Sequence, residues 1–386
     1  MQRLRIFLKT LIVSAILLIA GLSFRLTEPA KQKKPNIIFI LADDLGYGDV
    51  GFNGQTKIKT PNIDRMAREG MVFRQHYCGT AVCGPSRAAL LTGINTAHAS
   101  IRELTEWSLS GNPVNLLPTD VTVAKELKRA GYATGLIGKW GMDEGGTSGN
   151  ALAQGFDTFY GFKTHREAHH YYPEYIWKNN EKVMLPDNNC AEKRGTYSND
   201  SFADEARSFM QQHRNDQFFL YLPFTLPHNE LTVPADSKQP YENLGWPKRE
   251  MKVAHYHHDP DGNLTYAGMV SRLDRYVGQI LDELKKQHLD DNTLVIFSSD
   301  NGPGFDNGFF DSNGPFRGAK FQLYEGGIRA PFVARWPGNI KAGTVSNHAS
   351  AFWDFLPTVC ELAGIKPTAK IDGVSYLPTL LGKSGA

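Results

Sequence analysis

The sequence is poor in cysteine, and its net charge is close to zero. Four cysteines in 386 residues are too few for a disulfide scaffold, and they lack the paired spacing of zinc ligands. The 42 basic and 40 acidic residues give a net charge of +2, which gives no reason to expect nucleic acid as a partner. An anionic substrate would therefore need positive charge gathered locally at its binding site.

The N-terminus has the pattern of an export signal. Basic residues precede a short apolar run that ends in small residues (Arg3, Arg5 and Lys9; Leu11–Leu22; Gly21 and Ser23). We assign residues 1–34 to a signal peptide and short linker, and the apolar run is too short for a confident membrane span. An uncleaved N-terminal membrane anchor is the alternative. Either way, the body of the chain is expected in the periplasm or outside the cell.

After residue 34, apolar strands alternate with amphipathic helices. The predicted strands are residues 36–42, 133–137, 218–222 and 293–298, and the predicted helices are residues 62–69, 203–213, 266–287 and one capped by Thr119 and Asp120. Strands such as Asn36–Ala42 (NIIFILA) are apolar throughout, as expected when both faces are buried. This order predicts an α/β fold with a mostly parallel central sheet sandwiched by helices.

Polar side chains follow four of these strands. The first strand leads into Asp43 and Asp44, the second into Lys139, the third into His228, and the last into Asp300 and Asn301 (all at or just beyond the strand ends). Because ligands of open α/β sheets bind beyond the carboxyl ends of the strands, we expect these side chains to share one site.

Four of these residues offer oxygen ligands alone. Asp43, Asp44, Asp300 and Asn301 suit a hard cation, Ca²⁺ or Mg²⁺, and not zinc. Three carboxylates packed together would repel one another without a cation. Each Asp pair taken alone is equally compatible with a turn or a helix cap.

The segment Cys83-Gly84-Pro85-Ser86-Arg87 places a sulfur atom just before a predicted helix. Pro85 fits the first helical turn, and the free N–H groups of a helix N-terminus attract anions. Two other interpretations are a plain buried cysteine and a thiolate nucleophile of the phosphatase type. The phosphatase loop has five residues between Cys and Arg, however, and here there are three.

Cys83-Gly84-Pro85-Ser86-Arg87, followed by Ala-Ala-Leu-Leu-Thr-Gly, closely resembles the signature of type I sulfatases in the alkaline phosphatase superfamily. The resemblance extends from about Pro35 to Leu381. It implies that a formylglycine-generating enzyme oxidises Cys83 to Cα-formylglycine. It also implies hydrolysis of a sulfated carbohydrate or an aryl sulfate, so we place a sulfatase catalytic domain at residues 35–386.

The resemblance also implies roles for individual residues. Asp43, Asp44, Asp300, Asn301 and the modified Cys83 would bind Ca²⁺, with Mg²⁺ as the alternative. Arg87 would hold the modified side chain. Lys139 and Lys320 would contact sulfate oxygens, and His228 would act at the leaving-group oxygen.

One position departs from the family pattern. Many members have His directly after the Lys-Trp pair, where it can act as a base, and this chain has Gly141 there. His165 and His169 are candidates for that base or for substrate contacts. Arg102 is a further candidate substrate contact at the mouth of the site.

The family normally continues with a small C-terminal subdomain, which we expect to be largely missing because the chain ends at Ala386. Two alternatives to the sulfatase function stay open: a phosphate or phosphonate monoester hydrolase, and a non-catalytic protein that binds sulfated glycans. Nothing in the sequence indicates the sugar, the sulfate position or the oligomeric state.

Overall fold

The structure is a computed structural model that describes residues 34–104, 108, 114–143, 149–251, 255–304 and 308–383. The predicted signal peptide and anchor therefore lie outside the described residues, apart from Lys34. Within the described ranges, no helix is both long enough and apolar enough to cross a membrane.

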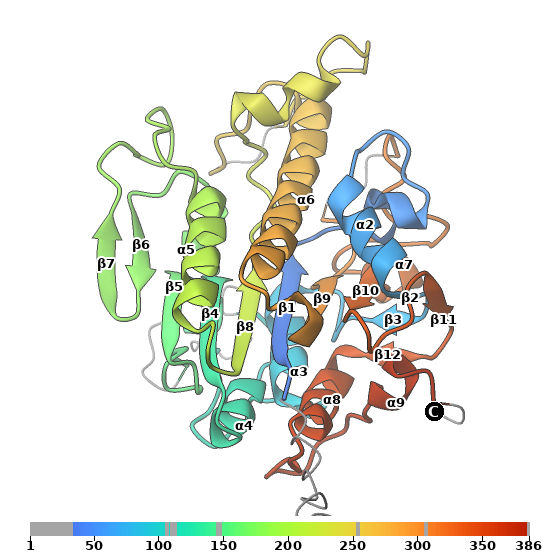
Figure 1. Cartoon of the computed structure of the whole chain (residues 1–386). Helices are drawn as coiled ribbons and strands as arrows, with labels where there is room; N and C mark the ends of the chain where they lie inside the picture. The colour runs from blue at the N-terminus through green and yellow to red at the C-terminus, as the bar shows by residue number, and fades with distance from the viewer. Residues whose placement is uncertain are drawn as a thin grey trace, which may run out of the picture. The chain divides into compact units, whose positions relative to one another are not determined.

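The centre of the fold is a ten-stranded sheet with the order β11-β2-β10-β9-β1-β8-β4-β5-β6-β7 (Figure 1). Its five central strands are parallel: β9 (Thr293–Ser299), β1 (Asn36–Ala42), β8 (Phe218–Pro223), β4 (Ala133–Lys139) and β5 (Thr158–Phe162). The prediction of a mostly parallel α/β sheet is thus confirmed.

Shorter strands complete the sheet at both edges. On the β9 side these are β10 (Phe332–Arg335), β2 (Met71–Phe73) and β11 (Thr344–Ser346), and on the β5 side β6 (Tyr175–Lys178) and β7 (Glu181–Met184). Strands β10, β6 and β7 run antiparallel to their neighbours, whereas β11 is parallel to β2. A separate pair of strands consists of β3 (His76–Tyr77) and β12 (Ser350–Ala351).

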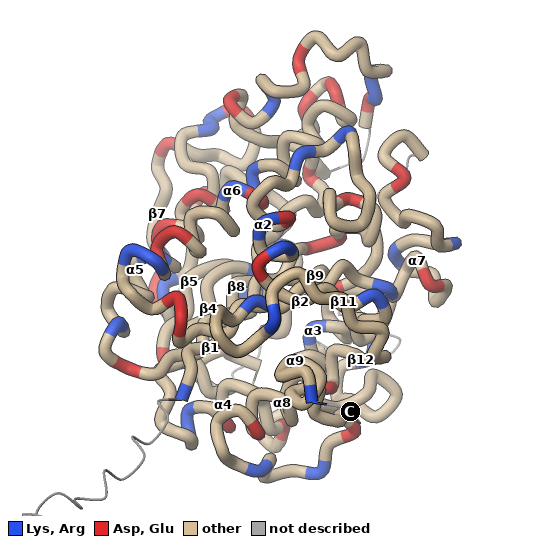
Figure 2. The backbone as a smooth tube through the Cα atoms, turned by 45° about the vertical axis from the view of Figure 1, so that its right-hand side comes forward, with Lys and Arg blue, Asp and Glu red and all other residues tan. Residues whose placement is uncertain are grey.

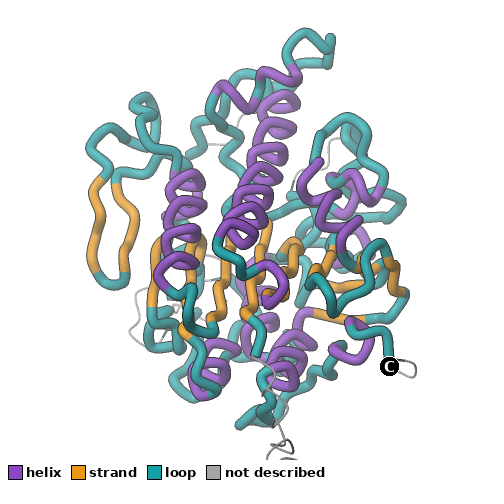
Figure 3. Tube along the Cα trace, in the orientation of Figure 1, coloured by secondary structure: helices purple, strands orange, loops and turns teal. Residues whose placement is uncertain are grey.

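Helices cover both faces of the sheet, as expected from strands that are apolar throughout. One face carries α2 (Pro61–Glu69), α5 (Ser198–Gln212) and α6 (Gly262–Lys286), and the other carries α3 (Cys83–Thr92), α4 (Val123–Arg129), α8 (Phe355–Leu362) and α9 (Leu377–Leu380). A hydrophobic core lies on each face of the sheet, and alternate residues of β1 point into the two cores. Ile38 and Ile40 belong to the core with α5 and α6, and Ile37 and Phe39 belong to the core with α3 and α8. Figure 3 shows α5 and α6 side by side over the strands.

Short helical segments lie in the connections. The four-residue helix α7 covers Glu325–Ile328, and single 3₁₀ turns cover Tyr47–Asp49, Gly51–Asn53, Glu167–His169, Ala235–Ser237, Gln239–Tyr241, Asp290–Asn292 and Phe352–Asp354. The turn at Glu167–His169 belongs to the loop that brings two predicted site residues to the sheet.

Four predicted helix starts need correction. Helix α5 begins at Ser198 and not at Ala203. Helix α4 is capped by Thr122, whose hydroxyl accepts a hydrogen bond from the Lys125 N–H at 3.2 Å, and not by Thr119 or Asp120. Helix α6 begins at Gly262 because the Asp261 side chain caps it. Helix α3 includes Cys83 and does not start after it. For α4 and α6 a capping side chain, and not the apolar pattern, sets the first turn.

The four cysteines are free thiols. Cys78 lies five residues before Cys83, is buried and forms no disulfide with it. Cys360 is fully buried on α8.

One buried histidine makes the stability of the fold depend on pH. His76 stacks on Phe332 with ring centroids 3.9 Å apart, and its Nδ1 lies 2.9 Å from the Ser350 hydroxyl. Burial lowers the pKa of His76 to about 3. The folded state therefore keeps His76 neutral, while the unfolded chain takes up a proton as pH falls below the ordinary histidine pKa.

We predict that the free energy of unfolding falls as the pH is lowered from roughly pH 6 to pH 4. The contribution of His76 to this loss is up to about 1.4 kcal/mol for each pH unit. His76→Asn keeps a hydrogen-bonding group near Ser350 and removes the titrating ring. Denaturant unfolding of both proteins across this range should give a shallower slope for the variant. The same substitution at His213 on the surface controls for losing one imidazole, and equal slopes for wild type and His76→Asn would contradict the prediction.

Candidate active site

The two predicted acidic pairs meet at the end of the sheet. Strands β1 and β9 are adjacent and parallel with Ala42 beside Ser299, so the residues that follow them come together. Asp44 N–H donates to the Asp300 carboxylate at 3.1 Å, and the Asn301 amide donates to the Asp44 carboxylate at 2.8 Å. All four side chains are almost fully buried, since none is more than 3% exposed.

Three cations from three other segments balance these carboxylates. Arg87 donates to Asp300 Oδ2 at 2.8 Å, Lys139 Nζ lies 2.7 Å from Asp43 Oδ2, and Lys320 Nζ lies 2.7 Å from Asp44 Oδ2. Burial alone would raise the pKa of Asp43, but the charges of Lys139 and Arg87 hold it well below its usual range. Burial and the neighbouring Asp43 carboxylate raise the pKa of Asp300.

In Figure 2, basic and acidic residues are mixed along the part of the backbone that is described. Positive charge at the site therefore comes from these three side chains and not from a basic surface, which fits the small net charge.

Two oxygen atoms of this cluster have no hydrogen-bond partner in the structure. They are Asp43 Oδ1 and Asn301 Oδ1, and both are buried. A buried oxygen without a donor costs free energy, and a cation is the partner that carboxylate and amide oxygens share. Because both residues belong to the predicted oxygen-ligand set, the residues present fit a hard divalent cation.

Cys83 lies beside this oxygen cluster at the first position of α3. Ligand atoms of Cys83, Asp43 and Asp300 lie within 4.8 Å of one another, and the Cys83 side chain is buried. Burial raises the pKa of the Cys83 thiol. The unmodified side chain is therefore a neutral thiol and a weak nucleophile at pH 7, which argues against the phosphatase-type thiolate.

Two side chains of helix α3, Ser86 and Arg87, fix the helix to the end of the sheet. The Ser86 hydroxyl donates to the backbone carbonyl of Asp300 at 2.5 Å, and Arg87 donates to the backbone carbonyl of Lys139 at 3.1 Å. Position 83 is thus held relative to both β9 and β4.

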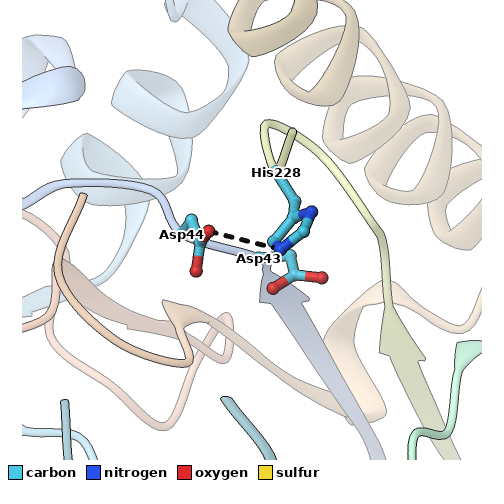
Figure 4. Close-up of side chains that lie close together, drawn as sticks. All are labelled: Asp43, Asp44 and His228. Atoms are coloured by element: carbon cyan, nitrogen blue, oxygen red, sulfur yellow. Dashed lines mark ion pairs between the residues drawn. The ribbon is translucent and has the colours of Figure 1, made fainter. Parts of the chain in front are cut away.

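His228 enters from the loop after β8. Its Nδ1 contacts the backbone carbonyl of Asn229, and its Nε2 lies 3.6 Å from Asp44 Oδ2. Figure 4 shows the imidazole beside Asp43 and Asp44 at the tip of β1. Burial and the charge of Lys320 lower the pKa of His228 to about 4.

A cavity of about 510 Å³ opens onto these groups. Its walls include most of the predicted catalytic and substrate-contact residues: Cys83, Lys139, His228 and Lys320, with His165 and His169. His165 Nδ1 lies 3.7 Å from Cys83 Sγ. Arg102 is exposed and is not among the lining residues; its contact with a substrate stays a prediction.

No motif in the sequence assigns His255 or Tyr256 to the site, and both lie in the connection between β8 and α6. Both line the cavity, and His255 Nε2 lies 3.1 Å from His169 Nδ1. His169 in turn stacks on His228 with ring centroids 5.6 Å apart. These histidines are far apart in the chain, and no spacing rule joins them.

Comparisons with known proteins agree with this geometry. A family model described as Sulfatase matches residues 35–365. N-acetylgalactosamine-6-sulfatase of Homo sapiens is 33% identical over 377 residues, covering 90% of this chain and 66% of that protein. Arylsulfatase G of Rattus norvegicus is 32% identical over 423 residues, covering 98% of this chain and 75% of that protein.

A solved structure has a similar fold. Ps i-CgsB, crystallised in complex with k-i-k-neocarrahexaose, superposes with a TM-score of 0.76 at 32% identity and covers 91% of this chain and 77% of that one. The chain spans about two thirds of the first of these relatives and about three quarters of the other two. With the family match over most of its length and an oxygen-ligand cluster beside Cys83, the chain belongs to the sulfatase family.

Proposed function

We propose that the protein hydrolyses sulfate esters of carbohydrates or aryl alcohols, using a formylglycine made from Cys83. The observation that carries this proposal is the position of Cys83, which lies within 4.8 Å of ligand atoms of Asp43 and Asp300 and lines a cavity with Lys139 and Lys320. Hydrated formylglycine supplies two hydroxyl oxygens on one carbon: one takes the sulfuryl group as the alcohol leaves, and deprotonation of the other expels sulfate and restores the aldehyde.

Asp43, Asp44, Asp300 and Asn301 would hold Ca²⁺, with Mg²⁺ as the alternative, and the cation would supply positive charge to the sulfate oxygens. In the structure Lys139 and Lys320 neutralise Asp43 and Asp44 at 2.7 Å. With the cation on the same carboxylates, Lys139 and Lys320 would be available to contact sulfate oxygens, and no buried carboxylate would be left unpaired.

His228 is suited to act at the leaving-group oxygen. Its Nδ1 contacts the backbone carbonyl of Asn229. Its Nε2 lies near Asp44, and the residue lines the cavity. With Lys320 also in the cavity wall, two groups are available to stabilise or protonate the departing alcohol. Arg87, held by two carboxylates, positions the modified side chain.

The substrate is proposed from the wall of the cavity and from the relatives. Tyr256, Phe321 and His169 give the cavity aromatic surfaces, which pack well against sugar rings. One relative named above acts on N-acetylgalactosamine 6-sulfate by name, and one similar structure holds a carrageenan-type oligosaccharide. A sulfated sugar is therefore the proposed substrate class.

Maturation and location belong to the same proposal. A formylglycine-generating enzyme would oxidise Cys83, and residues 1–34 would direct export to the periplasm or the outside. We also propose residues 35–386 as the catalytic domain. A phosphate or phosphonate ester hydrolase and a non-catalytic glycan-binding protein are the alternatives to test.

The first prediction from this proposed function concerns the modification of Cys83. Trypsin releases residues Gln75–Arg87 as one peptide, which holds both Cys78 and Cys83. In protein exported by its native host, mass spectrometry should find an aldehyde at position 83 and a thiol at position 78, so that Cys78 serves as an internal control. A Cys83→Ala variant should lose sulfatase turnover, and a thiol at both positions in active protein would contradict the proposal.

The second prediction concerns the cation. Ca²⁺ at about 100 times its dissociation constant should stabilise the folded protein by roughly 2.7 kcal/mol, measured by denaturant unfolding with and without chelator. Asn301→Leu should abolish this gain because it removes a ligand oxygen that has no other partner. Asp282→Asn, which changes an exposed carboxylate paired with Arg65, is the matched control. An equal gain in all three proteins would count against the site, and parallel titration with Mg²⁺ identifies the preferred ion.

The third prediction separates the candidate reactions. With aryl sulfate and aryl phosphate substrates that share one leaving group, kcat/KM for the sulfate should be at least about 100-fold higher. The reverse preference would favour the phosphate or phosphonate hydrolase. Binding of a sulfated oligosaccharide without turnover, in protein that carries the aldehyde, would favour the glycan-binding alternative.

A further inference from the structure

The side chain in contact with Cys83 Sγ is His165. Its Nδ1 lies 3.7 Å from the sulfur atom, and the imidazole is 5% exposed. The sulfur marks the place where the oxygens of an oxidised side chain would stand. Because those oxygens would take the place of the sulfur on Cβ, the Nδ1 atom lies next to the position of a hydroxyl proton there.

The backbone around His165 explains how a residue so far along the chain reaches position 83. The segments that follow β4 and β5 stay paired beyond the sheet, because Trp140 N–H donates to the Phe162 carbonyl at 2.9 Å and Gly141 N–H to the Lys163 carbonyl at 3.1 Å. The loop is also closed on itself, since the Glu167 carboxylate accepts the N–H of Lys163 at 2.8 Å.

Two glycines make room for the imidazole. A Cβ atom at Gly141 would lie 2.9 Å from His165 Cε1, and a Cβ atom at Gly84 would lie 3.0 Å from His165 Nε2. Gly141 also has a positive φ of 71°, which a residue with a side chain rarely adopts. The ring of His165 therefore occupies the space into which a side chain at position 141 would project.

The carboxylates and lysines beside Cys83 form ion pairs with one another. Asp43 Oδ2 accepts Lys139 at 2.7 Å, and Asp300 Oδ2 accepts Arg87 at 2.8 Å. The remaining oxygen of Asp43 belongs to the proposed cation site. Lys139 and Lys320 are held in ion pairs as cations, and His228 lies near Asp44.

We propose that His165 is the base of the second half of the reaction, a role that rests on the proposed sulfatase function. After the alcohol has left, the carbon at position 83 carries one hydroxyl and one O–SO₃⁻ group. His165 takes the hydroxyl proton, the oxygen's electron pair forms the C=O bond, and the C–O bond to sulfate breaks with its electrons leaving on sulfate. One water then adds back to the aldehyde, and His165 releases its proton to solvent.

This assignment gives the two imidazoles different steps. His228 serves the departing alcohol, and His165 serves the departing sulfate. It also explains how Gly141 is compatible with activity, because the imidazole comes from the loop after β5 and not from the end of β4.

The experiment is rapid-quench kinetics of fully matured protein with an aryl sulfate, on wild type, His165→Gln, His165→Gly and the surface control His213→Gln. Aldehyde content at position 83 is measured first by mass spectrometry, and rates are expressed per aldehyde. His165→Gln should release about one equivalent of aryl alcohol in a burst and then turn over roughly 10²–10⁴-fold more slowly than wild type. The peptide Gln75–Arg87 from quenched His165→Gln should carry one added SO₃ unit at position 83. His213→Gln should behave as wild type.

His165→Gly provides a second readout. Added imidazole should restore its steady turnover and remove the added SO₃ from the peptide, because the vacated space lies beside position 83. His228→Gln should show the opposite pattern, with slow alcohol release and no added SO₃.

A His165→Gln enzyme that turns over within a few-fold of wild type, or that loses its alcohol burst without gaining SO₃, would overturn the assignment. Neither result would contradict the proposed function, provided that the wild-type protein carries the aldehyde and hydrolyses the ester. A thiol at position 83 in active wild type would instead overturn the proposed function itself.

Discussion

The site depends on one electrostatic constraint: three carboxylates are buried together at the ends of two adjacent strands. Asp43, Asp44 and Asp300 cannot all stay ionised away from water unless positive charge lies within contact distance. The structure meets this requirement with Arg87, Lys139 and Lys320, which come from a helix, a strand end and a distant loop. The need for neutralisation therefore draws together the segments that carry Arg87, Lys139 and Lys320.

Much of this arrangement could be predicted from the sequence, because it follows from parallel strands. Strands β1 and β9 were recognisable as apolar runs, and the pairing of Ala42 with Ser299 makes the next residues neighbours. The Cys83–Arg87 spacing places both side chains one helical turn apart, so both reach the sheet end. Where backbone geometry is regular, position in the chain fixes position in space.

The parts that could not be predicted depend on irregular loops. The cap of α4 is Thr122 and not the predicted Thr119 or Asp120, because the Thr122 hydroxyl accepts a hydrogen bond from the first turn. His255 and Tyr256 line the cavity because a long connection between β8 and α6 folds back over the sheet end. The contact of His165 with Cys83 depends on the pairing of two loops beyond β4 and β5, which leaves no periodic signal in the sequence.

The burial of α3 has a consequence for the order of events during biosynthesis. All ten residues of the helix are buried, from Cys83 to Thr92, and the sulfur atom stands behind the sheet end and the surrounding loops. On the proposed maturation, an enzyme that binds this segment as an extended peptide would act before α3 folds, because the folded helix buries the segment. Oxidation and folding would then compete in time. The fraction of modified molecules would follow the relative rates of the two processes, and not the stability of the finished protein.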